Sequence, residues 1–494
     1  MKHSHFEKAP RGCCRRDFLG AMGTAAGGIA LNYTSAGAAT GTAKSARQKK
    51  EPATVRAAFI YPPSAKLRVP GGWWSWPGND FDAEGRQAAY TGRLKQIEQK
   101  LAIRILMEKT PLDTQESVTK FVNQVKDSKP DGLLLIPFKH GHFAQVNRIL
   151  GEVGLRTDNS REPAEPAMPT VIFSCLGVKH GPVKQYKRPG VYFIQSLDNL
   201  DAIEYGMRMI KTRRFMSQAR IISIAGAAEP KEATVPFWGT RVRVLPLKRF
   251  EEEVNRTEIT DEVKQLARAY ARNAKEILEP KEPEILTAAR VHFANKQILE
   301  AERGDAIMID CLRRGRLVPC MSYMSLRDTG VAAGCENDLS ATLTLMLVQE
   351  LFDRPGFQHN PCFETEANHY FASHCTCASR LFGTGMPSEP YLLRNYGHNN
   401  FPTCVPQVLW REGEDVTMAH YVPGKPPGML VYSGRTVKSY AMPPVGGCRT
   451  NVEITINELD DACDVKGHHN VVFYGNYARQ LRQFARLFGM TVMV

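Results

Sequence analysis

Apolar residues in the first third of the chain follow two alternating periods. Short continuous apolar runs, typical of strands buried on both faces of a parallel sheet, alternate with longer segments in which apolar residues recur at helical spacing. This succession of strand and helix predicts a doubly wound α/β domain. The strands are expected at Val55–Tyr61, Ala102–Met107, Asp131–Phe138 and Thr170–Cys175, and the helices at Ala83–Leu101, Gln115–Ser128 and His142–Val153.

A second unit with the same pattern is expected from about residue 191. Ala225-Gly-Ala-Ala follows one of its strands but lacks the Gly-x-Gly-x-x-Gly spacing, and no Walker lysine is present, so no nucleotide site is predicted. The strands are expected at Val191–Ile194, Arg220–Ile224, Thr240–Leu247 and Asp305–Cys311, and the helices at Asn199–Met216, Asp261–Leu278 and Ile285–Ala301, with a further helix after Asp338.

Beyond residue 378 the pattern changes to short alternating strands interrupted by Gly and Pro, which predicts a β-rich domain, for which a barrel is one arrangement. We therefore expect a targeting segment and linker (1–53), two doubly wound, Rossmann-like α/β domains (54–190 and 191–377) and a β-rich C-terminal domain (378–494). The strands of the last are expected at Val416–Tyr421, Gly428–Tyr432, Thr436–Ala441, Asn451–Ile456 and Met490–Val494, with a helix at Tyr477–Leu487.

Length and charge narrow the class of protein. A chain of 494 residues is too long for one core and indicates two or three domains. The net charge of +13 is concentrated at the N-terminus, because residues 1–50 hold nine Lys and Arg against Glu7 and Asp17. The remainder has no long basic run, so nucleic-acid binding is not expected. No apolar run after the leader approaches the roughly 20 residues of a membrane span.

The N-terminus has the features of a targeting segment. Arg15-Arg16 is followed by Asp-Phe-Leu, an Ala/Gly-rich stretch and small residues at 36–39. This pattern resembles a twin-arginine signal, which directs export of folded proteins to the periplasm or another extracytoplasmic space. The alternative is a disordered basic tail.

Cysteine and tryptophan usage each leave two interpretations. The ten cysteines after the leader lack the dense spacing of a disulfide scaffold, and His374-Cys-Thr-Cys377 lacks the Cys-x₂-Cys pairing of a zinc site, which favours buried thiols. Trp73, Trp74 and Trp76 share a loop after the first strand. Their rings could stack on a sugar ring, or they could pack at a contact between domains or subunits, and the second interpretation is favoured.

Candidate metal ligands lie between Gly334 and Cys377 and near the C-terminus. Glu336 belongs to a Gly-Cys-Glu-Asn-Asp turn before a helical apolar run, with Glu364, Glu366 and His374 downstream and a His468-His469 pair near the end. Carboxylates and imidazoles from distant segments are what a Mn²⁺ or similar divalent site requires. The alternative is that Glu336 only caps the helix that follows.

Several of these motifs resemble the L-arabinose isomerase/L-fucose isomerase superfamily. The motifs are Ala-Gly-Cys-Glu-Asn-Asp-Leu, the His374-Cys375 segment, and Gly-His-His-Asn-Val-Val-Phe followed by Gln-Leu-Arg-Gln-Phe-Ala-Arg-Leu-Phe-Gly-Met. This likeness covers roughly Val318–Val494. The resemblance implies a fucose/arabinose isomerase-like fold and an aldose–ketose isomerase. Such an enzyme moves a proton between C1 and C2 of an open-chain pentose or deoxyhexose through a cis-enediol, with Mn²⁺ as cofactor.

The resemblance also implies roles for individual residues. Glu336, His374 and His469 match metal ligands, and Glu336 also matches a catalytic acid. The second acidic position falls on Asn360 in the fucose-type spacing, whereas Glu364 lies nearer the arabinose-type spacing; either would complete the site, but an amide is not a base. His398, Arg449, His468 and Asp338 are expected near the substrate, the last as a group that orients a ligand.

Family members assemble as trimers or hexamers, so a homo-oligomer is expected here. Three functions remain open at this point: an exported metal-dependent isomerase, another metal-assisted sugar reaction on the same scaffold, and a sugar-binding relative without catalysis.

Overall fold

The computed structural model describes residues 50–494, except residues 73, 75–77, 79, 155–167, 198, 227–228, 313–315, 398–400 and 442–447. The expected export signal therefore lies outside the described residues, as do Trp73, Trp76 and His398.

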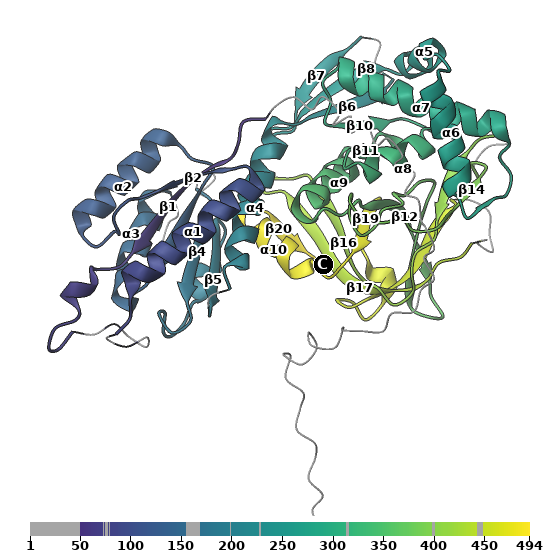
Figure 1. Cartoon of the computed structure of the whole chain (residues 1–494). Coiled ribbons are helices and arrows are strands. Elements are labelled where there is room, and N and C mark those ends of the chain that lie inside the picture. Colours follow the sequence, from purple (N-terminus) through teal and green to yellow (C-terminus); the bar gives the residue numbers. More distant parts are fainter. Residues whose placement is uncertain are drawn as a thin grey trace, which may run out of the picture. The chain divides into compact units, whose positions relative to one another are not determined.

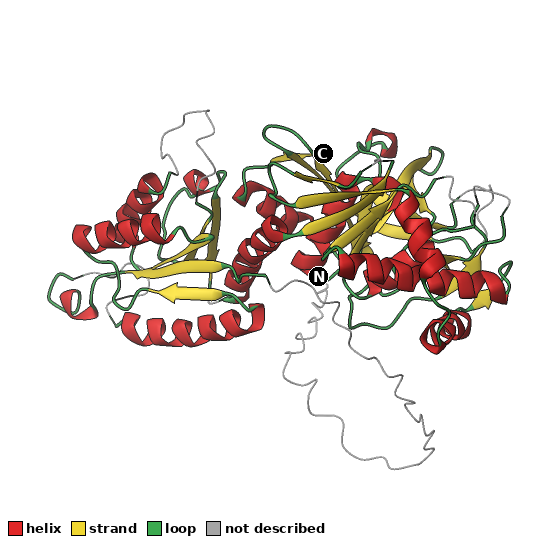
Figure 2. Ribbon diagram, turned by 90° about the horizontal axis from the view of Figure 1, so that it is seen from above, coloured by secondary structure: helices red, strands yellow, loops and turns green. Residues whose placement is uncertain are grey.

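The first α/β domain is built on a five-stranded, all-parallel sheet with the order β2-β1-β3-β4-β5. Figure 2 shows helices on both faces of this sheet, as expected for a doubly wound layer. The strands are β1 (Thr54–Ile60), β2 (Arg104–Met107), β3 (Gly132–Pro137), β4 (Thr170–Cys175) and β5 (Val191–Ser196), and the helices are α1 (Ala83–Leu101), α2 (Gln115–Ser128), α3 (Phe143–Glu152) and α4 (Asp201–Gln218).

Trp74 belongs to the core of this domain. Its side chain is fully buried, with ring centroids 6.4 Å from Tyr61 and 5.2 Å from Phe81. This tryptophan is therefore not open to a sugar, and it packs within its own domain, whereas the favoured expectation was a domain or subunit contact.

The second α/β domain has a five-stranded sheet with the order β11-β10-β6-β8-β7, parallel except at the β7–β8 edge. Helix α9 packs between one face of this sheet and the β-rich domain, because its apolar residues share a core with both. The strands are β6 (Arg220–Ala225), β7 (Lys231–Thr234), β8 (Arg241–Pro246), β10 (Ala306–Ile309) and β11 (Ala332–Gly334), and the helices are α5 (Lys248–Arg256), α6 (Asp261–Asn273), α7 (Glu282–Ala301), α8 (Cys320–Asp328) and α9 (Leu339–Phe352).

The C-terminal sheet is barrel-like (Figure 1). Its seven strands have the order β16-β19-β12-β13-β18-β17-β20, and the additional β16–β17 pairing closes the ring. The strands are β12 (Phe357–Glu364), β13 (His369–His374), β16 (Asp415–Val422), β17 (Gly428–Lys438), β18 (Thr450–Ile456), β19 (Asn470–Tyr474) and β20 (Thr491–Met493). Helix α10 (Ala478–Leu487) precedes β20, and a small sheet of β9 (Glu276–Ile277), β14 (Tyr391–Arg394) and β15 (Val405–Val408) lies apart from the ring.

The sheet pairings move two of the expected domain boundaries. Strand β5 was expected to open the second unit, but it pairs with β4 and completes the first sheet. Residues 357–374 were assigned to the second α/β domain with no strand expected there, but they form β12 and β13 of the barrel-like sheet. Local periodicity cannot reveal either assignment, because the partner of a strand is chosen by tertiary packing.

Two elements also differ from their expected lengths. The helix expected to reach Leu278 ends at Asn273, because residues 276–277 pair with β14 instead. The two strands expected around residue 434 are one continuous strand, β17, in which Gly434 is retained because a Cβ there would lie 1.9 Å from the Thr455 carbonyl oxygen.

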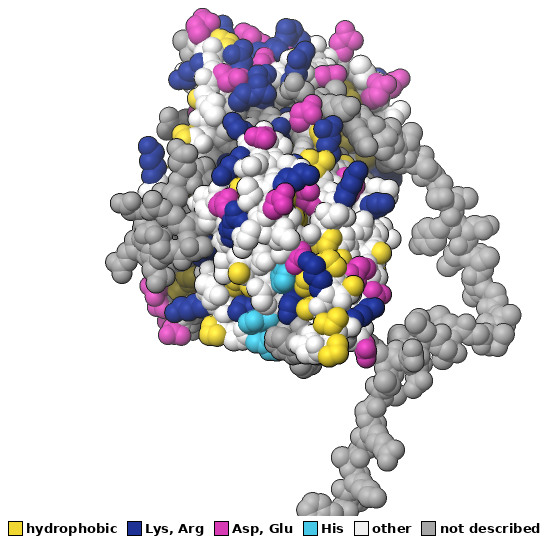
Figure 3. Space-filling view, turned by 90° about the vertical axis from the view of Figure 1, so that its left-hand side faces the viewer, with side chains coloured by type: hydrophobic (Ala, Val, Ile, Leu, Met, Phe, Trp, Pro, Cys, Tyr) yellow, Lys and Arg dark blue, Asp and Glu magenta, His cyan; other side chains and the backbone are white. Residues whose placement is uncertain are grey.

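The surface and the thiols complete the description. On the face shown in Figure 3, basic and acidic side chains are interspersed. Six of the ten cysteines in the described part of the chain are buried. Among the described residues, no helix is both long enough and apolar enough to cross a bilayer.

Candidate metal centre

The turn between β11 and α9 carries the first candidate ligand. It lies at the carboxyl end of the parallel strands β10 and β11, where α/β sheets place ligands. Gly334 is required here because a Cβ would lie 1.9 Å from Thr342 Oγ1. Glu336 and Asn337 both have φ of 56°, a left-handed conformation that non-glycine residues adopt at a cost, often at functional sites.

Side chains from neighbouring elements hold this turn. Ser223 Oγ donates to Asn337 Oδ1 at 2.8 Å, and the Gln358 amide bonds both the N–H (2.9 Å) and the carbonyl (3.1 Å) of Cys335. Asp338 is the residue that caps α9, because its carboxylate accepts from the N–H of Ala341. Glu336 is therefore not needed as the cap, and its carboxylate is directed elsewhere.

Two histidines from the barrel-like sheet face the Glu336 carboxylate. His374 ends β13, and its Nε2 lies 3.4 Å from Glu336 Oε1. His469 directly precedes β19, again with a left-handed φ of 55°, and its Nε2 lies 3.4 Å from Oε2. Their ligand atoms and that of Glu336 all lie within 4.8 Å of one another.

The ionisable groups influence one another strongly. The imidazoles of His374 and then His469, whose Nε2 atoms each lie 3.4 Å from the carboxylate, hold the pKa of Glu336 well below its usual range. Burial disfavours the charged form of His469, but the adjacent carboxylates of Asp338 and Glu336 outweigh burial and raise the pKa of His469 to about 9. Without a metal, the centre at neutral pH therefore holds an imidazolium between two carboxylates, and a metal must displace that proton.

Asp338 orients His469. Nδ1 of His469 lies 2.9 Å from Asp338 Oδ2, and because an ionised carboxylate only accepts, Nδ1 carries a proton. Because Nδ1 is bonded to Asp338, the other ring nitrogen, Nε2, points towards Glu336. A carboxylate behind a histidine in this way is typical of metal sites, where it fixes the tautomer and the ring orientation.

We expect Asp338→Asn to weaken divalent-metal binding by about 10–100-fold, because the amide no longer holds Nδ1–H of His469 as firmly. Competition with a chromophoric chelator measures this loss. Far-ultraviolet circular dichroism serves as the folding control, since Asn also caps helices well. An unchanged metal affinity in a folded variant would show that Asp338 only caps α9.

Asn360 follows His359 on β12, and His359 pairs with Asn470, the residue after His469, so Asn360 comes level with His469 in the register of these two strands. On β12 it shares a face with Gln358, whose amide hydrogen-bonds the backbone of Cys335. On the neighbouring strand it pairs in register with Ser373, the residue before His374. Its Oδ1 is buried and makes no hydrogen bond to the described residues. An acceptor of this kind is costly to bury alone and is suited to a cation.

Glu364 is not brought to the same place. It is exposed at the far end of β12, roughly 13 Å from Asn360 at the usual rise of about 3.3 Å per residue, and it accepts from the N–H of Glu366. The expectation that Glu364 fills the second acidic position is thus not supported by its placement. The strand runs away from the turn before it reaches this residue.

Glu364→Gln is accordingly expected to change metal affinity by less than about twofold, as for other exposed substitutions away from a site. Isothermal titration of the metal-free protein with Zn²⁺ and Mn²⁺ measures this. A loss of metal affinity as large as that expected for Asp338→Asn would show that Glu364 takes part in metal binding.

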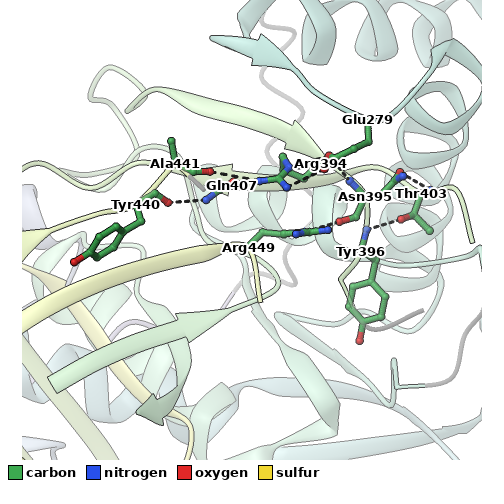
Figure 4. A network of polar contacts seen from close by, with 9 residues as sticks. All are labelled: Glu279, Arg394, Asn395, Tyr396, Thr403, Gln407, Tyr440, Ala441 and Arg449. Carbon is green, nitrogen blue, oxygen red and sulfur yellow. Dashed lines mark hydrogen bonds and ion pairs between the residues drawn. The ribbon is translucent and has the colours of Figure 1, made fainter. Parts of the chain in front are cut away.

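The remaining predicted site residues have different surroundings. His468 is exposed, with its ring 4.3 Å from that of His469. Arg449 donates from Nε to the carbonyl of Asn395 at 2.8 Å, within the polar network of Figure 4. In that network the next residue, Tyr396, donates its N–H to Thr403. Arg449 thus holds a loop that borders the centre.

A small cavity is lined by Glu336 and His374 of the centre, and it shares Val318 with a larger cavity. The smaller, about 10 Å³ for the centre of a water-sized sphere, admits roughly one water. The larger measures about 110 Å³. The smaller is lined by Cys311, Val318, Pro319, Cys320, Cys335, Glu336, His374, Cys375 and Tyr396, and the larger by Pro283, Glu284, Thr287, Ala288, Val291, Arg316, Val318, Pro402, Thr403 and Cys404.

His420 is a member of the centre that the sequence did not single out. It lies on β16, where burial lowers its pKa against the opposing charge of Asp338, and its ring hydrogen-bonds the backbone of His469. A single histidine within an alternating strand carries no distinctive signal. Only the approach of β16 to β19 shows that it supports a candidate ligand.

Comparison with models of known protein families and with curated protein sequences finds no match for the chain.

Proposed function

We propose that Glu336, His374 and His469 bind a divalent metal ion and that the protein is a metal-dependent aldose–ketose isomerase acting on an open-chain sugar. The observation that carries this proposal is the convergence of three ligand atoms within 4.8 Å from three segments distant in sequence. The motif resemblance to the arabinose and fucose isomerases supports the reaction type.

The donor atoms fit a metal ion. Nε2 of both histidines is buried, and neither makes a hydrogen bond within the described residues apart from its 3.4 Å approach to Glu336. Nδ1 of His469 is engaged by Asp338, which leaves Nε2 as the ligating nitrogen. When bound, a divalent cation polarises a carbonyl oxygen and neutralises charge that develops on adjacent sugar oxygens.

Glu336 is the candidate base. Its carboxylate is kept ionised by the two histidines, and a carboxylate on one face of an open-chain sugar can remove the C2 proton and return it at C1. Asp338 is occupied by His469 and the N–H of Ala341, and the Asn360 amide is not a base. Of the described residues in the centre, Glu336 alone has a carboxylate directed at both candidate histidine ligands.

Proton exchange tests this proposal. The protein is incubated with Mn²⁺, Zn²⁺ or Co²⁺ in D₂O with a panel of aldoses and ketoses, and the C1 and C2 protons are followed by NMR. Deuterium incorporation that both EDTA and Glu336→Gln abolish is expected. Absence of exchange with every sugar and metal, in protein shown to retain its metal, would exclude the isomerase.

Asn360 favours a second candidate, a sugar-binding or otherwise non-isomerase relative on the same scaffold. The amide replaces a carboxylate where the resemblance implies an acid, and Glu364 is too far along β12 to compensate. This candidate predicts sugar binding, measurable by calorimetry, that survives Glu336→Gln and is accompanied by no exchange.

We also propose that the chain is exported and self-associates. Arg15-Arg16 supports export, and replacing both by lysine is expected to retain the protein in the cytoplasm, as fractionation and immunoblotting would show. The resemblance supports a trimer or hexamer, which sedimentation equilibrium tests. Neither a nucleic-acid partner nor a membrane partner after signal cleavage is part of the proposal.

A further inference from the structure

The charge of the candidate centre differs from that of a carboxylate-rich site. The cluster of Glu336, His374 and His469 supplies one carboxylate and two imidazoles. With neutral imidazoles and a divalent cation, the occupied centre has a net charge of +1. A second carboxylate ligand would bring that charge to zero.

Among the described residues, no other carboxylate is placed to act as a second acidic ligand and neutralise this charge. Asp338 lies behind His469, with one oxygen 2.9 Å from Nδ1 and the other accepting from Ala341 at 2.8 Å. Glu364 is exposed at the end of β12. A further buried oxygen donor on β12 is Asn360 Oδ1, which is neutral and belongs to the residue level with His469 in the β12–β19 register.

This donor set determines which cations the centre favours. Mg²⁺, Ca²⁺ and Mn²⁺ are suited to carboxylate, carbonyl and water oxygens, whereas imidazole suits zinc, iron and their neighbours. Two histidines and one glutamate hold catalytic zinc in several enzymes, and two histidines with one carboxylate hold non-haem iron(II). Neutral nitrogen donors outnumber anionic oxygen donors here.

We propose that the centre is selective for a transition-metal ion of the zinc, cobalt and iron(II) class over Mn²⁺ and Mg²⁺, because its donors are two imidazoles and one carboxylate, with the neutral Asn360 amide as the further oxygen on β12. This inference rests on the proposed function, since it takes the same three residues as metal ligands.

The thiols of the adjoining cavity offer an alternative ligand set. Cys335 and Cys311 hydrogen-bond each other, and both line the cavity together with Glu336 and His374. The only group of His, Cys, Asp and Glu ligand atoms close enough to share an ion, among the described residues, nevertheless contains no sulfur. The proposal is therefore for nitrogen and oxygen ligation alone.

Metal titration of the chelator-stripped full chain tests the selectivity. Affinities for Zn²⁺, Co²⁺, Mn²⁺ and Mg²⁺ are measured separately by calorimetry or chelator competition. Because divalent affinities normally rise from Mn²⁺ to Co²⁺, the informative quantity is the change of the Co²⁺/Mn²⁺ ratio in Asn360→Asp. We expect the added carboxylate to raise Mn²⁺ affinity more than Co²⁺ affinity, so that the ratio falls by at least about tenfold.

The absorption spectrum of the Co²⁺-loaded wild type provides a measurement that needs no variant. Ligation by nitrogen and oxygen gives ligand-field bands alone, whereas a cavity cysteine adds thiolate-to-cobalt charge transfer in the near ultraviolet. Glu366→Gln, which alters an exposed carboxylate on the same hairpin, is the matched control for Asn360→Asp. It should leave the ratio unchanged.

Three results would overturn the inference: wild-type Mn²⁺ affinity equal to or above that for Co²⁺, a ratio unchanged in folded Asn360→Asp, or a thiolate band. Its failure is distinguishable from that of the proposed function. A selective centre without sugar exchange refutes only the isomerase, and sugar exchange at a centre that prefers Mn²⁺ refutes only the selectivity. Failure of the wild type to bind any of the four ions refutes both.

Discussion

Glu336→Gln is expected to lower divalent-metal affinity by more than the roughly 10–100-fold typical of residues that only orient a ligand. The carboxylate is the one anionic group that faces both His374 and His469, at 3.4 Å in each case. An amide of the same shape retains the volume but loses the charge and one acceptor oxygen. Competition with a fluorescent chelator measures the affinity, and sugar exchange should disappear in parallel.

Two controls make this result specific. Circular dichroism should show an unchanged fold, because no backbone hydrogen bond to the Glu336 side chain is among the interactions that hold the turn. Glu366→Gln removes an exposed carboxylate and should bind metal as the wild type does. Wild-type affinity in folded Glu336→Gln would show that the ion binds elsewhere.

Acid is expected to destabilise the protein through His359. This side chain is fully buried on β12, with Nδ1 3.0 Å from the Phe357 carbonyl and Nε2 2.9 Å from the Tyr370 hydroxyl. Burial lowers the pKa of His359 to about 3. The unfolded chain, in which a histidine has a pKa near 6.5, therefore binds more protons than the folded one at any pH between these values.

The sign follows directly: the free energy of unfolding contributed by His359 falls as pH decreases from about 6.5 towards 3, by about 1.4 kcal/mol per pH unit. Urea unfolding at a series of pH values, compared between the wild type and His359→Gln, isolates this contribution from that of the carboxylates. We expect the variant to lose stability about 1.4 kcal/mol per unit more slowly between roughly pH 6 and pH 4. Parallel curves would contradict a neutral, buried His359.

Local signals were sufficient for most regular elements. Helices α1 and α2 have the expected bounds, because an amphipathic period is flanked by a residue that caps the N-terminus, Asp82 or Thr114. The buried strands β3 and β4 were marked by continuous apolar runs. The interactions that set the bounds of these helices and strands are local, within one helical turn or one strand.

Candidate ligands were likewise visible as residue types in motifs. Glu336 was identified by its turn, His374 as an imidazole downstream of it, and His469 as part of the His468-His469 pair near the end of the chain. Sequence left the second acid undecided between Asn360 and Glu364. Strand register separates the two positions, because Asn360 pairs with Ser373 within the sheet whereas Glu364 lies at the exposed end of the hairpin.

Patterns along the chain were enough to predict the α/β character of the first two units, the β-rich character of the last, and the types of side chain available for a metal centre. These depend on periodicity and composition, which are local. Only the tertiary structure decided that β5 completes the first sheet, that β12 and β13 join the barrel-like sheet, and that His420 supports His469. The assignment of these strands depends on which distant strands pair. The support of His469 depends on contacts with Glu336 and Asp338, which lie more than a hundred residues away along the chain.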